Sequence, residues 1–192
     1  IKEVRSRSFD ILKEYSTKHH DKNIPQEVQS IIELEKLSDI LDKATDHKSQ
    51  LTLLSNLKRL LVEGAKPTIK CYDTIKKLST DEHLDNSISL EILEILRIIT
   101  KNKGKIPADI LEILSQRVKI KDNRPADQQQ KLLVQIFTGA ELNNQPIPSS
   151  FINKLSNLIG SQDIIESNES LVMLFFVARA SKGSDVSKKV ID

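Results

Sequence analysis

Apolar residues recur along the chain at spacings of three and four, in short stretches separated by polar breaks. This is the period of a helix that buries one face, and no stretch shows the sustained alternation of a half-buried strand. We call the more apolar of these stretches the B helices. They span residues 51–61, 88–99, 131–137 and 171–178. The pattern therefore predicts an all-α protein.

A less apolar stretch precedes each B helix, and we call these stretches the A helices. Each begins at a proline, and the four prolines are 42, 40 and 41 residues apart: Pro25, Pro67, Pro107 and Pro148. Proline suits the first turn of a helix, because its φ is already helical and its missing N–H would have no intrahelical partner. Only six prolines occur in the chain, so this recurrence predicts a structural repeat.

Polar residues and glycines mark the ends of the predicted helices. Residues such as Asp46 and Asp85 stand before B helices, where their side chains can accept from the first N–H groups. All five glycines lie near helix ends: Gly64, Gly104, Gly139 and Gly183 after B helices, and Gly160 after the fourth A helix. We expect left-handed backbone at these glycines.

Repeats of about 40 to 47 residues built from helix pairs are typical of HEAT and armadillo proteins, and the chain resembles this family in period and helix pairing. The resemblance covers nearly all of residues 6–190. It implies a right-handed α-solenoid of stacked helix pairs, whose B helices line a concave face that holds a partner. The chain has no tryptophan, so the Trp/Asn ladder of peptide-binding armadillo proteins is missing. The prolines start their helices, unlike the mid-helix proline of HEAT repeats.

The repeat predicts one continuous array over residues 1–192. Its expected parts are a partial repeat at 1–24, repeats at 25–66, 67–106, 107–147 and 148–185, and the start of a fifth at 186–192. Terminal repeats of a complete solenoid normally carry polar outer faces, and neither end of this chain has one. We therefore expect a fragment of a longer protein, whose terminal repeats could self-associate.

Composition favours a protein or peptide partner over a nucleic acid or a membrane. The formal charge is +2, from 29 basic and 27 acidic residues, which gives no strong field toward phosphate. No apolar run approaches the roughly 18 residues of a membrane span. The only cysteine, Cys71, cannot form an internal disulfide, and this mildly favours an intracellular location.

Candidates for chemistry are few. Cys71 stands among apolar residues of an A helix, which predicts a buried thiol. The four histidines lack the close ligand spacing of a zinc site, and phosphate-binding and hydrolase motifs are missing from the sequence. We expect no catalytic residue, no metal and no cofactor, and hence a scaffold rather than an enzyme.

Polar residues of the B helices are the candidates for partner binding. They are Arg59, Glu91, Glu94, Arg97, Lys101, Lys131, Gln135 and Arg179. Aligning residues 58–61 with residues 96–99 makes Arg59 and Arg97 equivalent, and arginine can bind a carboxylate through two parallel hydrogen bonds. The plainer interpretation of the same residues is a solvated helix face.

The sequence is also compatible with other functions. A basic run from Arg117 to Arg124 is compatible with an RNA-binding helical-repeat module, although such modules usually have shorter periods and stacking residues. A structural spacer, and a secreted effector directed at a host, are further alternatives. Phe175 and Phe176 are adjacent in a B helix, which indicates burial on two sides or a contact between copies of the chain.

Overall fold

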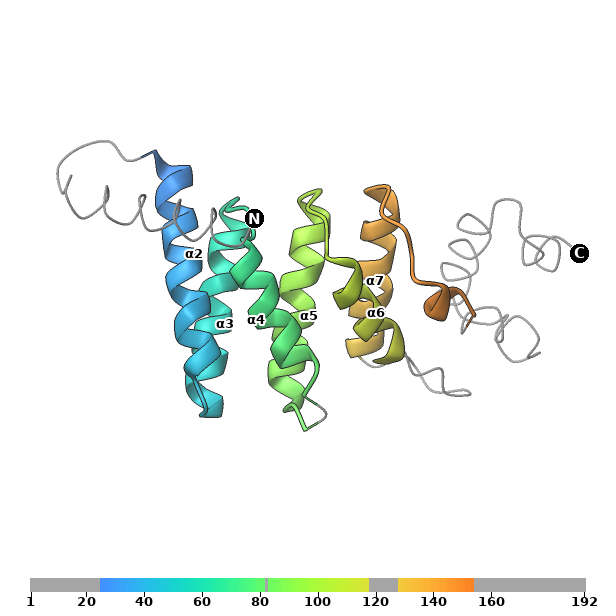
Figure 1. The fold of residues 1–192 in the computed structure, drawn as a ribbon, viewed down its shortest axis with the longest axis horizontal. Helices are drawn as coiled ribbons and strands as arrows, with labels where there is room; N and C mark the ends of the chain where they lie inside the picture. Colours follow the sequence, from blue (N-terminus) through green and yellow to red (C-terminus); the bar gives the residue numbers. More distant parts are fainter. Residues whose placement is uncertain (1–24, 82, 118–127, 154–192) are drawn as a thin grey trace, which may run out of the picture. The chain divides into compact units, whose positions relative to one another are not determined.

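The computed structural model describes residues 25–81, 83–117 and 128–153. This part of the chain contains helices and turns and no strand, which confirms the all-α prediction. Its helices are α2 (Gln26–Lys43), α3 (His47–Val62), α4 (Ile69–Ser79), α5 (Asn86–Lys101), α6 (Ala108–Arg117) and α7 (Gln128–Leu142) (Figure 1). The chain is helical again over 149–153. The fourth B helix, Gly160, Gly183 and Arg179 lie outside the described residues.

The chain divides into two compact units, Ile1–Ile75 and Lys76–Asp192, with the boundary inside α4. In the first unit, α2 and α3 pack against each other and run in opposite directions (Figure 1). In the second unit, α5 and α7 lie side by side and run in the same direction. The predicted A helices correspond to α2, α4 and α6, and the predicted B helices to α3, α5 and α7.

The apolar residues at helical spacing form the core of each unit. In the first unit, Leu34 of α2 and Leu54 and Leu57 of α3 have no exposed surface. In the second unit, Phe137 of α7 stacks on Phe151, with ring centroids 3.9 Å apart. Burial of such side chains from water is the main stabilising contribution to a helical fold of this kind.

The helices begin one or two residues after their prolines, whereas the sequence predicts that they begin at the prolines. Pro25 is the N-cap of α2, and the carbonyl oxygens of Pro107 and Pro148 accept the first hydrogen bonds of the helices that follow them. Pro67 precedes Thr68, whose hydroxyl oxygen accepts from the N–H of Cys71 at 3.2 Å. Proline thus stands just outside these helices, where its fixed φ still limits the entry of the chain.

Among the described B helices, the left-handed residue at the end is a glycine only after α3. Gly64 has φ +97° after α3, but Lys103 (φ +60°) and Asn144 (φ +55°) take the same place after α5 and α7. The next N–H along the chain donates back into the last turn in each case, as from Gly104 to the Ile99 carbonyl at 2.8 Å. These are Schellman ends, in which backbone groups satisfy the last carbonyls of a helix.

Gly104 and Gly139 serve close packing, and the expectation of left-handed backbone at these two glycines is wrong. A Cβ atom at Gly139, inside α7, would lie 2.6 Å from Oγ1 of Thr100 on α5. A Cβ atom at Gly104 would lie 2.8 Å from a methyl carbon of Ile99. Both glycines therefore allow an approach that any side chain would block.

In the second unit, two amide side chains after the end of α7 bond to the end of α5 and to the segment that follows it. The Asn143 amide donates to the carbonyl oxygen of Thr100 at 2.8 Å. The Gln145 side chain accepts from the N–H of Ile106 at 2.9 Å and donates to the carbonyl oxygen of the same residue at 2.7 Å. These bonds fix the α7 end against the α5 end, because each would leave a polar group without its partner if lost.

Candidate partner-binding surface

The ends of α3, α5 and α7 fix which of their positions are equivalent. Asp46 and Asp85 are the N-caps of α3 and α5, and each accepts a backbone N–H at 2.8 Å. Both helices have 16 residues, and the left-handed residues that follow them are Gly64 and Lys103. Start and end therefore agree on an offset of 39 residues, and Asn144 gives an offset of 41 from α5 to α7.

This register does not make the two candidate arginines equivalent. Arg59 corresponds to Ile98, which is buried, and Arg97 corresponds to Lys58. The alignment by apolar residues is wrong by one position, because α5 is buried on two sides. The buried leucines of α3 coincide with buried residues of α5 at an offset of 38 as well as 39.

On each of the described B helices α3, α5 and α7, the same set of equivalent positions is not buried, and we call this side of each helix its B face. Its members recur at spacings of three and four, as expected for one side of a helix. They are Lys48, Leu51, Ser55, Lys58 and Val62 in α3; Ser87, Leu90, Glu94, Arg97 and Lys101 in α5; and Gln128, Lys131, Gln135, Thr138 and Leu142 in α7.

Most of the candidate residues within the described part of the chain lie on the B face: Glu94, Arg97, Lys101, Lys131 and Gln135. Lys101, Lys131 and Gln135 are exposed, and the other two are half-buried. Glu91 of α5 lies beside the B face, and the equivalent residue of α7, Leu132, is buried. Lys58 and the apolar members were not predicted from the sequence, because a polar stripe excludes apolar residues and the offset was wrong by one position.

Glu94 and Arg97 form an ion pair on α5. Nε and Nη2 of Arg97 both donate to Oε2 of Glu94, at 2.9 and 2.7 Å. The Arg97 side chain is 32% exposed and the Glu94 side chain is 27% exposed, so this part of the B face is not fully solvated. The two charges offset each other, and both side chains keep some exposed surface.

Arg59 is held by carboxylates of its own unit. Its Nη1 donates to Oε1 of Glu63 at 2.8 Å, and its Nη2 lies 3.7 Å from Oε1 of Glu33 on α2. Arg59 thus links α3 to α2 and stands next to the B face rather than on it. Exposed pairs of this kind contribute little to stability.

Arg117, the first residue of the basic run, forms hydrogen bonds with other residues of the second unit. Its guanidinium donates to the backbone carbonyl of Ser79, at the end of α4, and lies 3.5 Å from the hydroxyl oxygen of Ser89. A cation suits this place, because the carbonyl end of a helix carries partial negative charge. Arg117 is half-buried and its guanidinium is bonded to the protein, so this residue offers little to an RNA phosphate.

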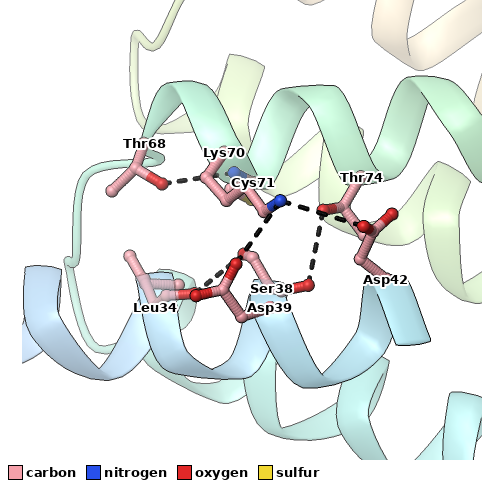
Figure 2. A network of polar contacts seen from close by, with 8 residues as sticks. All are labelled: Leu34, Ser38, Asp39, Asp42, Thr68, Lys70, Cys71 and Thr74. Carbon is pink, nitrogen blue, oxygen red and sulfur yellow. Dashed lines mark hydrogen bonds and ion pairs between the residues drawn. The ribbon is translucent and has the colours of Figure 1, made fainter. Parts of the chain in front are cut away.

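Cys71 lies on the side of α4 that faces α2 (Figure 2). It is fully buried, and burial raises the pKa of its thiol from 9.0 to about 12, with a further rise from the Glu35 carboxylate. A thiol with this pKa is protonated at neutral pH, and the thiolate is the reactive form. The geometry therefore agrees with a packing role for Cys71.

Polar contacts surround this thiol and join α2 to α4 (Figure 2). The Lys70 ammonium lies 3.4 Å from the Asp39 carboxylate and 3.8 Å from that of Asp42. The Thr74 hydroxyl donates to the backbone carbonyl of Ser38 at 3.5 Å. These contacts join α2 to α4.

The described part of the chain forms neither a cluster of metal ligands nor a helix able to span a membrane. No three His, Cys, Asp or Glu side chains within 25–81, 83–117 and 128–153 come close enough to share a metal ion. None of the helices from α2 to α7 combines the length and apolar character that a bilayer span requires. Comparison with known proteins found no matching family model, and neither a curated protein nor a solved structure matches the chain significantly.

Proposed function

We propose that this chain is a non-enzymatic interaction module, in which helix pairs stack as a right-handed α-solenoid of the HEAT or armadillo kind. The support is the recurrence of one local plan: an aspartate cap and 16 helical residues in α3 and α5, and a Schellman end in α3, α5 and α7. A repeat of this sort cannot bury its apolar face alone and is stabilised by its neighbours.

The B face is the proposed binding surface for a protein or peptide partner. The single observation that carries this proposal is that five positions stay uncovered on α5, where most other positions are buried, and that the equivalent positions of α3 and α7 are uncovered too. A surface that keeps one register from helix to helix can contact an extended partner at each repeat.

A matched pair of tryptophan substitutions tests the proposal. Gln135→Trp places a bulky side chain on the B face of α7, and Gln116→Trp makes the same change at an exposed position of α6 in the same unit. Both variants and the wild type are immobilised and exposed to lysate, after circular dichroism has shown equal helix content. We expect a specific protein to be lost with Gln135→Trp and kept with Gln116→Trp.

Equal recovery of every captured protein by the two variants would contradict binding on the B face. The remaining interpretation would then be a structural spacer. Recovery of RNA rather than protein, with the same loss in Gln135→Trp, would keep the surface and change its ligand.

A further inference from the structure

We draw no further inference here: the strongest candidate, the B face of α5 and α7, carries nothing beyond the function proposed above, because nothing in the structure shows what covers it.

Discussion

Gly139 shows how one missing side chain sets the approach of two helices. Alanine normally stabilises a helix interior relative to glycine by about 1 kcal/mol. At Gly139 the new Cβ would lie 2.6 Å from Oγ1 and 2.7 Å from Cβ of Thr100, so one helix must shift. We expect Gly139→Ala to lower the free energy of unfolding by about 1–3 kcal/mol, as overpacking does. Urea unfolding followed by circular dichroism measures the change.

The sign of the change in unfolding free energy shows whether overpacking or helix propensity dominates at Gly139. Gln135→Ala, at an exposed position one turn earlier in α7, is the control and should leave stability within about 0.5 kcal/mol. Stabilisation by Gly139→Ala would mean that only helix propensity acts there and that α5 and α7 are not in close contact at Thr100.

Cys71 makes stability depend on pH in the alkaline range. Its folded pKa of about 12 lies above the ordinary value of 9.0, so the folded state holds its proton longer than the unfolded state. The contribution is complete below pH 9 and is lost as pH rises toward 12. We expect the free energy of unfolding to fall by up to about 1.4 kcal/mol per pH unit above this point.

Urea titrations at several pH values between about 8 and 10 test this dependence, with Cys71→Ala as the control. The variant loses packing at every pH, but it should lack the additional alkaline slope. Burial also raises the pKa of Tyr72, which acts in the same direction at higher pH in both proteins. Parallel pH profiles for wild type and Cys71→Ala would show that the thiol ionises equally in both states.

At the scale of a helix, the B-helix ends carry unequal strain. Lys103 and Asn144 both have positive φ, but asparagine tolerates this conformation better than lysine. Relief of strain outweighs the greater freedom that glycine gives the unfolded chain. We expect Lys103→Gly to raise the free energy of unfolding by roughly 0.5–1 kcal/mol, and Asn144→Gly to change it less. Thermal unfolding of the two variants compares them.

Lys105→Gly is the control for the α5 end. Lys105 is exposed in the same turn and is not among the positive-φ residues, so glycine there should give no gain. If Lys103→Gly is no more stable than Lys105→Gly, the left-handed residue contributes no strain that glycine could relieve.

Local patterns predicted the helices well, because periodicity and caps act within a few residues. Asp46 and Asp85 could be identified as caps from their place before an apolar stretch, and both accept the expected N–H. Gly139 could not be interpreted in this way, because its reason is Thr100, on another helix. The sequence shows a glycine near a helix end and does not show what approaches it.

The candidate surface was predicted only in part, for a related reason. Apolar positions alone align α3 with α5 at two offsets, since α5 is buried on two sides. Only the caps and the Schellman ends distinguish these offsets, and they separate Arg59 from Arg97. The B face then includes Lys58, which the wrong offset left out, and Val62 and Leu142, which no rule based on polar residues would select.

At the scale of the whole molecule, a repeat architecture predicts that damage stays local. In such arrays, stability is close to a sum of the repeats and their nearest-neighbour contacts. Gly139→Ala perturbs the contact of α5 with α7 in the second unit. Leu54→Ala removes a fully buried side chain of α3 in the first unit, at a cost of about 2–5 kcal/mol. The two variants therefore form a pair with damage in different units.

Native-state hydrogen exchange measures where protection is lost. We expect Gly139→Ala to speed exchange mainly over residues 86–101 and 128–142, and Leu54→Ala mainly over residues 26–43 and 47–62. A globular domain that unfolds as one unit gives another result: each variant would speed exchange of the slowest amides throughout the chain by the same factor. That outcome would contradict the stacked-repeat architecture, and with it the physical reason for a binding face that recurs from helix to helix.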